Sequence, residues 1–221
     1  MRLSTVTKTF SALALSLGML TVSAQAQAAA LNLNLEGAPA PDIASFYNSF
    51  SYSAIDDLLT ITGAALSFRA EDNTQKNIDT PNYNFNLTAN IDDSGTFLGG
   101  VFEITGTVAE LGYNSGSLLT GSLTAFGFES GSETLEFTFD ATGGDSYSRY
   151  LEDAYYVGGM VLSNTGFNSG DFTQDWSASE QDSKIDTSVI SAVPEPSSYL
   201  LMGLGLVMLS GFVRRQNSKQ A

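Results

Sequence analysis

Apolar and polar residues alternate along much of the chain, and this alternation predicts β-strands. Within Tyr83–Ile91 every second residue is apolar, with Asn or Thr between them. The same period of two runs through Leu135–Phe139, Phe46–Ser53 and Leu31–Leu35. A period of two that is rich in Phe, Tyr, Ile and Thr is typical of strands with one buried face. We therefore predict strands at these four segments.

Short segments rich in Gly, Asn, Asp and Ser separate the alternating runs and predict turns. They are Asp93-Ser94-Gly95, Asn114-Ser115-Gly116, Ser130-Gly131-Ser132, Gly143-Gly144-Asp145 and Asn168-Ser169-Gly170. The nearest candidate for a helix in this region is Arg149–Tyr156. Strands joined by tight turns predict an all-β fold, either an antiparallel β-sandwich or a meander that forms an open barrel.

A short internal repeat agrees with a meander. Asp93–Gly106 aligns with Asn114–Gly127 at an offset of 21 residues, with five of 14 positions identical, and Leu58–Gly63 echoes the pattern. We interpret each unit as a turn followed by a pair of strands that ends at Gly, where the chain bends. Two or three units are too few for a solenoid.

The first 28 residues have the composition of a secretory signal peptide. Arg2 and Lys8 supply positive charge, and Phe10–Val22 is an apolar run. That run is short for a membrane-spanning helix, and small and polar residues follow it directly. The segment therefore predicts export with removal of the signal peptide.

Two sites of the form Ala-x-Ala follow the apolar run and indicate where the signal peptide is cut. The first ends at Ala26 and the second at Ala28. Signal peptidases accept small residues at these spacings. We prefer the cut after Ala28, so the mature chain begins at Ala29, or at Gln27 if the first site is used.

The C-terminal end has a second apolar run. Tyr199–Val213 carries no charge, and Arg214, Arg215 and Lys219 follow it. A helix of this length is about 22 Å long, and flanking arginines can extend its reach into the headgroup region. We predict a short transmembrane helix with its arginines on the cytoplasmic side.

Val193, Pro194, Glu195 and Pro196 stand just before this apolar run. The order of a Pro-Glu-Pro triplet, an apolar helix and an arginine cluster over Val193–Gln220 resembles the PEP-CTERM sorting signal. The resemblance implies processing by an exosortase, a membrane-embedded cysteine protease or transpeptidase. It also implies a bacterium that makes exopolysaccharide, with the cargo exported with that matrix or attached to it.

These segments predict three parts of the chain. Residues 1–28 are the signal peptide, residues 29–192 are an all-β extracytoplasmic domain and residues 193–221 are the sorting signal. The residues of the sorting motif are Val193, Pro194, Glu195, Pro196, Arg214 and Arg215. We expect the protein to be anchored in the inner membrane by its tail, and to reach the cell surface or extracellular matrix after processing, in association with exopolysaccharide or biofilm.

The charge of the chain narrows the range of partners. All 24 acidic residues lie within Ala29–Glu195, where only Arg69, Lys76, Arg149 and Lys184 oppose them, so this segment carries a net charge of −20. Such a surface repels phosphate backbones and anionic lipids, which argues against nucleic acid as a partner.

The absence of Cys and His limits the kinds of catalytic site that the protein can contain. Without Cys there are no disulfides and no thiolate nucleophiles, and without His there is no Ser-His-Asp triad. An active site would depend on carboxylates, Tyr, Lys or Ser. The enzymatic alternative is a small carboxylate glycosidase.

Two groups of side chains are candidates for ligand binding. Asp92 with Asp93, and Asp140 with Asp145, lie beside turn residues and offer oxygen ligands for Ca²⁺, although Asp is also a common turn residue. The second group is aromatic and consists of Trp176, Tyr155 and Tyr156. These rings suit a sugar-stacking platform, with core or interface packing as the alternative.

We therefore expect a non-enzymatic surface or matrix protein that is delivered by its sorting tail and needs no cofactor apart from Ca²⁺ at the acidic pairs. The alternative from another class is a glycan-binding, lectin-like module.

Overall fold

Strands make up most of the chain that the structure, a computed structural model, describes, which is residues 28–33, 35, 40–79, 83–129, 131–150 and 156–191. The strands are β1 (Asp42–Ser53), β2 (Leu58–Arg69), β3 (Gln75–Asn77), β4 (Phe85–Ile91), β5 (Phe97–Thr105), β6 (Ser117–Phe128), β7 (Leu135–Gly143), β8 (Tyr156–Ser163) and β9 (Trp176–Ser191). Two short 3₁₀ helices are η1 (Ala109–Leu111) and η2 (Tyr147–Tyr150). The predicted all-β class is confirmed.

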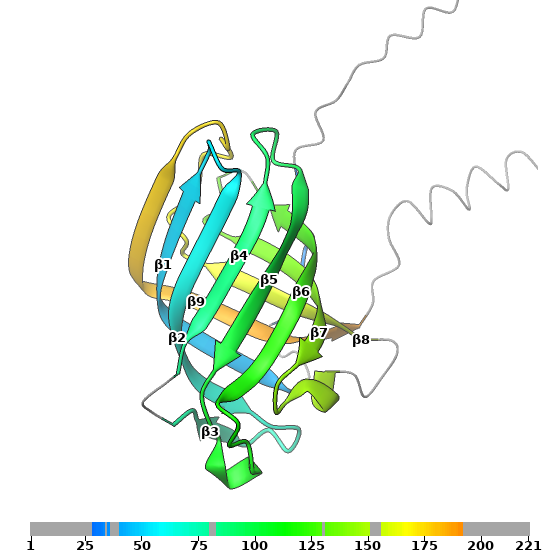
Figure 1. Cartoon of the computed structure of the whole chain (residues 1–221). Helices are drawn as coiled ribbons and strands as arrows, with labels where there is room; N and C mark the ends of the chain where they lie inside the picture. Colours follow the sequence, from blue (N-terminus) through cyan, green and yellow to red (C-terminus); the bar gives the residue numbers. More distant parts are fainter. Residues whose placement is uncertain are drawn as a thin grey trace, which may run out of the picture.

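The sheet closes into an antiparallel barrel of eight strands, with β3 paired outside the ring to β2 (Figure 1). Each of the eight barrel strands pairs with the next barrel strand along the chain, as predicted for a meander, with β4 following β2 in the ring. The prediction of a sandwich or open barrel is wrong because β1 pairs with both β2 and β9. The contact with β9 runs from Asp42 opposite Ser188 to Tyr52 opposite Trp176. This pairing removes the two free edges that an open sheet leaves.

The alternation in the sequence decides which side chains lie inside the barrel. Along β4 the apolar residues of the period-two pattern are buried, and the Asn and Thr residues between them are exposed. Phe137 and Phe139 of β7 likewise point inward, and ring pairs such as Phe102–Phe139, with centroids 4.7 Å apart, fill the interior. The barrel interior is therefore a packed hydrophobic core.

The two ends of the barrel carry different loops. The β4–β5 end holds the β1–β2, β4–β5, β6–β7 and β8–β9 loops, and the β3 end holds the others. Phe172 of the β8–β9 loop closes the β4–β5 end, with its ring 5.4 Å from that of Tyr52 and 4.9 Å from that of Phe167. The apolar core therefore extends into this loop.

The internal repeat corresponds to single strands. Asp93–Gly106 contains β5, and Asn114–Gly127 contains most of β6. The prediction of a strand pair in each unit is wrong because each strand uses nine to twelve residues and leaves no room for a hairpin. The repeated Gly121 is explained by crowding, since a Cβ there would lie 2.3 Å from the Phe102 ring.

Two predictions for the ends of the chain fall outside the described residues, namely the signal peptide at residues 1–28, of which only Ala28 is described, and the apolar helix at Tyr199–Val213. Among the described residues, no helix has the length and apolar character needed to cross a membrane. The helix candidate Arg149–Tyr156 overlaps the 3₁₀ helix η2 at Arg149 and Tyr150 and is wrong at Tyr156, where β8 begins, whereas residues 151–155 lie outside the described part.

Candidate functional site

The N-terminal strap, which we define as residues 28–33 and 35, crosses the outside of the barrel wall. Ala28 packs against the core near Gly95 of the β4–β5 loop, and Leu31 lies against Gly127 of β6. Further along, a side-chain carbon of Leu35 lies 3.4 Å from where a Cβ on Gly159 of β8 would be. The strap therefore passes over β6, β7 and β8 before the chain enters β1.

Glu136 of β7 holds the strap to the wall. Its carboxylate accepts backbone N–H groups from Leu31 at 2.7 Å, Asn32 at 3.0 Å and Leu33 at 2.7 Å. Although Glu136 occupies an outward position between Leu135 and Phe137, its side chain is only 6% exposed. A buried carboxylate needs such donors, and bonds to a charged acceptor are among the stronger hydrogen bonds in proteins.

The prediction of a strand at Leu31–Leu35 is wrong for the described part of that segment. Asn32 has a positive φ of 57° and donates a side-chain bond to the carbonyl of Ala30 at 3.1 Å. This local conformation, which Asn tolerates well, interrupts an extended strand. The backbone donors bond to one side chain where a strand would bond to a neighbouring backbone.

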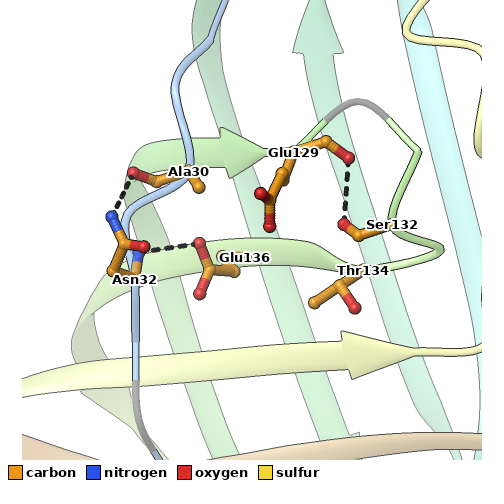
Figure 2. Close-up of a pocket in the computed structure, with 6 residues that line it drawn as sticks. All are labelled: Ala30, Asn32, Glu129, Ser132, Thr134 and Glu136. Carbon is orange, nitrogen blue, oxygen red and sulfur yellow. Dashed lines mark hydrogen bonds between the residues drawn. The ribbon is translucent and has the colours of Figure 1, made fainter.

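A small cavity of about 120 Å³ opens beside the strap (Figure 2). It is lined by Ala30 and by five residues with polar side chains, namely Asn32, Glu129, Ser132, Thr134 and Glu136. The hydroxyl of Ser132 donates to the backbone carbonyl of Glu129 at 2.9 Å. The cavity is therefore built from the strap on one side and the β6–β7 loop with its flanking strands on the other.

A second feature of the outer wall is a belt of short polar side chains. Two rows of outward residues follow the strand register round the barrel from β9 through β1, one as far as β7 and the other as far as β6. One row contains Ser177, Ser51, Thr60, Thr88, Val101, Ser122 and Asp140. The other contains Ser179, Ser49, Thr62, Asn86, Glu103 and Thr120. We call these residues the hydroxyl belt.

The hydroxyl belt is nearly uncharged although the domain as a whole is strongly acidic. Glu103 and Asp140 are its charged members, and all belt residues are exposed except Thr60 and Thr120, which are half-buried. Neighbouring strands are about 4.8 Å apart, so the belt is a regular array that consists mostly of hydroxyl and amide groups, with the exposed apolar side chain of Val101 among them. Such groups both donate and accept hydrogen bonds.

The predicted metal ligands do not form one site. Asp92 and Asp93 follow β4 at the β4–β5 end, whereas Asp140 and Asp145 lie toward the β3 end, on β7 and in the loop after it. Within the ranges that the structure describes, no group of three or more potential metal-ligating side chains is found. The sequence named these aspartates as two separate pairs, and calcium binding at either pair stays a prediction, since a calcium site needs further oxygen ligands around one point.

Asp92 stabilises the turn in which it lies by accepting hydrogen bonds from it. Its Oδ1 accepts from the Ser94 N–H at 2.9 Å, the Ser94 hydroxyl at 2.6 Å and the Thr96 N–H at 2.8 Å. The hydrogen bond from the Ser94 hydroxyl, followed by that from the Thr96 N–H, lowers the pKa of Asp92. Asp145 accepts from the Ser115 N–H at 2.9 Å. Both residues support the turn-forming alternative.

Two further aspartates repeat this arrangement. Asp72 accepts from the N–H and hydroxyl of Thr74, and Asp171 accepts from those of Thr173. In each case the threonine hydroxyl bond is the main cause of a lowered pKa for the carboxyl group. The spacing Asp-x-Ser/Thr is visible in the sequence at all three turns and would have predicted them.

Trp176 lies at the start of β9, half-buried. Its ring stacks on that of Phe167, with centroids 4.7 Å apart and an interplanar angle of 23°, and it lies 6.5 Å from the ring of Phe50. These contacts fit the packing alternative, since Phe167 occupies one face of the indole. Tyr155 and the side chain of Tyr156 lie outside the described residues, so the aromatic platform stays a prediction.

The sequence did not indicate Glu136 as a special residue. In the alternating run it has the place of an exposed polar side chain. The available signal is its cross-strand partner Gly127, which leaves room for another segment of chain. Of the predicted cleavage residues, Ala28 and Ala29 belong to the strap, whereas Ala26 lies outside the described residues.

The residues of the sorting motif also lie outside the described part, and comparison with known families identifies them. Residues 192–216 match the model of the PEP-CTERM protein-sorting motif. This span contains Val193, Pro194, Glu195 and Pro196 together with the arginine pair 214–215. The motif supports an exported protein that is sorted through its C-terminus. Comparisons with curated proteins and with solved structures gave no match.

Proposed function

We propose that the chain is a non-enzymatic matrix protein whose barrel binds neutral extracellular polysaccharide after an exosortase-type enzyme has processed its tail. The sorting motif at residues 192–216 supports delivery to the cell surface. The observation that carries the binding step is the hydroxyl belt. On this proposal the tail anchors the precursor in the inner membrane, and the barrel is the cargo that reaches the matrix.

The chemistry of the belt suits a polymer of sugars. Each sugar presents several hydroxyls, and the Ser, Thr and Asn side chains of the belt can donate to and accept from them. Many individually weak contacts along one chain give useful affinity through multivalency. A rigid barrel wall supports this mode because its side chains are positioned without ordering a loop.

Charge decides which polysaccharides fit. The segment that contains the barrel carries a net charge of −20, so an anionic polymer is repelled. In the belt, only Glu103 and Asp140 would face the polymer with a charge. A neutral polysaccharide is therefore the favoured ligand, and raised salt should weaken the repulsion of an anionic one.

Several described carboxylates are occupied by structural hydrogen bonds, which supports a binding role rather than glycoside hydrolysis, and Asp42, whose pKa is raised by burial, forms an ion pair with Arg69. Asp72, Asp92 and Asp171 have lowered pKa values and accept turn hydrogen bonds, and Glu136 accepts three backbone N–H groups. A glycosidase needs one carboxyl kept protonated as a general acid. Release of reducing sugar from the polysaccharide that is bound would contradict the non-enzymatic proposal.

The test is co-sedimentation of the exported protein with amorphous cellulose as a neutral polymer and with alginate as an anionic one. We expect retention on cellulose and little on alginate at low salt. Replacing Thr60, Thr88 and Ser122 together with Ala should reduce retention on cellulose severalfold. The matched control replaces Gln75 and Gln181, which are exposed outside the belt, with Ala and should bind as the parent does.

Equal retention of the parent and the belt variant would contradict the belt as the binding surface. Circular dichroism melting of both variants shows whether the barrel is intact, and we expect small changes because Thr88 and Ser122 are exposed and Thr60 is only half-buried.

A further inference from the structure

The cavity beside the strap has two carboxylates in its lining, those of Glu129 and Glu136 (Figure 2). Glu129 directly follows β6 and is exposed, whereas Glu136 of β7 is only 6% exposed. Within the described part of the chain, no basic side chain lines this cavity. The cavity therefore has two negative charges in its wall and no positive group from the described barrel to balance them.

The four basic residues of the described chain form ion pairs elsewhere. The pairs are Arg69 with Asp42, Lys76 with Glu110, Arg149 with Glu71 and Lys184 with Asp186. A carboxylate that is removed from water is stabilised by a positive group nearby. A cation that enters the cavity from outside the protein would supply that group.

Glu136 keeps capacity to accept one more hydrogen bond. A carboxylate has about four acceptor sites, and the strap occupies three of those on Glu136. Its Oε2 accepts from the Leu31 and Asn32 N–H groups, whereas its Oε1 accepts from Leu33 alone. Buried acceptors in proteins are usually satisfied. An acceptor site that remains on a nearly fully buried carboxylate beside a cavity points to a donor that binds from the cavity.

Both walls of the cavity are held in place by hydrogen bonds within the protein. The strap is held by Glu136. The β6–β7 loop is held by the β8–β9 loop, since the Gly131 N–H donates to the Asn168 carbonyl at 3.2 Å and the Thr165 N–H donates to the Glu133 carbonyl at 3.0 Å. A ligand can therefore bind here without the entropy cost of ordering a loop.

The size and the acceptors of the cavity select the chemistry of its ligand. A bound water needs about 10–15 Å³, so a cavity of about 120 Å³ has room for a group of several non-hydrogen atoms. A primary ammonium carries a positive charge and three N–H donors, for which Glu129, Glu136 and the Thr134 hydroxyl supply acceptors. Ca²⁺ fits less well, because it takes about six to eight oxygen ligands and the strap already uses three acceptor sites of Glu136.

We propose that this cavity binds a primary ammonium group, and that its ligand is an amino sugar with a free amine. The ammonium part depends only on the cavity, whereas the sugar part rests on the proposed binding of matrix polysaccharide. A mostly neutral polymer that carries some free amino groups would contact the belt through its hydroxyls and the cavity through its amines. The negative charge of the domain attracts such a polymer and repels an anionic one.

The test is an NMR titration of the isotope-labelled, exported protein at pH 6, where a sugar amine is protonated. The probes are D-glucosamine, N-acetyl-D-glucosamine, methylammonium chloride and calcium chloride at matched ionic strength. We expect glucosamine to bind about tenfold more tightly than N-acetylglucosamine, whose amide carries no charge, and to shift the amide signals of the β6–β7 loop and the strap. Methylammonium should shift the same signals with lower affinity, because it lacks the sugar hydroxyls.

Glu129→Gln should weaken the binding of glucosamine about tenfold, because it removes one of the two charges at the cavity. Glu129 is exposed, so this variant should fold as the parent does. Glu133→Gln is the matched control, since Glu133 is exposed in the same loop and does not line the cavity, and it should bind as the parent does. The belt variant with Ala at positions 60, 88 and 122 should also keep its affinity for glucosamine.

Equal affinities for glucosamine and N-acetylglucosamine would overturn the inference, and so would equal affinities of the Glu129→Gln and Glu133→Gln proteins for glucosamine. Tighter binding of Ca²⁺ than of glucosamine, with the same dependence on Glu129, would make the cavity a metal site and contradict the proposal. Methylammonium that binds as tightly as glucosamine would support the ammonium part and overturn the sugar part. A parent protein that binds glucosamine but is not retained on cellulose would contradict the proposed function and leave the ammonium site supported, which makes the two failures distinguishable.

Discussion

Gly127 and Glu136 are direct cross-strand partners in β6 and β7, and together they form the site on the barrel wall where the N-terminal strap binds. Gly127 has no side chain, so the strap backbone can approach the wall to a distance that a Cβ would prevent. Glu136, directly opposite, accepts the N–H groups that this close approach brings within reach. One residue supplies space and the other supplies hydrogen-bond acceptors, so loss of either should release the same segment.

Glu136→Gln should destabilise the protein by about 2–4 kcal/mol, because bonds to a charged acceptor are worth about 1.5–3 kcal/mol each and the amide keeps one acceptor oxygen. Its NH₂ group would face backbone N–H donors. Urea unfolding at neutral pH measures the change. Glu133→Gln should change the free energy of unfolding by less than about 0.5 kcal/mol, as is usual at exposed positions. Equal free energies of unfolding for the two variants would contradict the role of Glu136 in holding the strap.

Gly127→Val should free the strap without touching the Glu136 carboxylate. A Cβ at this position would lie 2.5 Å from the Cγ of Leu31 and 3.0 Å from the Ala29 carbonyl oxygen, so the strap must move. We expect limited proteolysis to cut the strap several times faster than in the parent. Gly143→Val is the control, because a Cβ there meets only the Thr120 hydroxyl at 3.1 Å. The prediction fails if both variants are cut at the same rate.

The sequence predicts those parts of the fold that depend on the local alternation of apolar and polar residues. Alternation located β4 and β7 because one face of each is buried, and turn residues separated the strands correctly. Closure of the barrel was not predictable, since it depends on pairing β1 with β9 across more than a hundred residues. The first half of β9, Trp176–Asp182, is mostly exposed and shows no apolar alternation, and β1 contains two register shifts.

The strap was mistaken for a strand for a related reason. Leu31, Leu33 and Leu35 alternate with Asn, as they would in a sheet edge. What distinguishes them is the partner of their N–H groups, which is the Glu136 side chain over 100 positions away. The alternation within one segment gives no information about a hydrogen-bond partner so far away in the sequence. The role of Glu136 is therefore visible only in the three-dimensional structure.

Asp42→Asn should not destabilise the protein at neutral pH, although Asp42 forms an ion pair with Arg69 at 3.0 Å. Burial, followed by the nearby charge of Asp186, raises the pKa of Asp42 above its usual 3.8 despite the pairing. A raised pKa for an acid means that its ionised form opposes folding at pH values above that pKa. The variant should therefore match or exceed the parent in melting temperature at pH 7, and lose that advantage below pH 3.8. A clear loss at pH 7 would mean that the ion pair dominates.

Asp92→Asn should act in the opposite direction. The Ser94 hydroxyl and the Thr96 N–H lower the pKa of Asp92 below 3.8, so the ionised form stabilises the fold. That contribution is present above pH 3.8 and is lost as the pH falls through the lower folded-state pKa. The variant should show a smaller drop in melting temperature between pH 5 and pH 2 than the parent, which differential scanning calorimetry can measure. An identical acid profile would show that the turn bonds do not depend on the charge.

Substitutions in the two parts of the sorting signal, the Pro-Glu-Pro triplet and the arginine pair, should disturb sorting in different ways. Because proline disfavours a helix at its own position and at the residue before it, we expect Pro194 and Pro196 to hold Glu195 in an extended segment, which is the form in which a protease binds a substrate. Replacing the triplet with Ala-Ala-Ala should leave an uncut, membrane-bound precursor of higher mass. Arg214 and Arg215 should resist translocation, so replacing both with Gln should let unprocessed protein leave the membrane.

Immunoblots of membrane, periplasmic and medium fractions from a host with an exosortase distinguish these outcomes. If both variants were processed like the parent, the match at residues 192–216 would not reflect a working signal. If only the arginine variant were processed normally, the arginines would be dispensable for topology, and recognition would depend on the extended triplet alone.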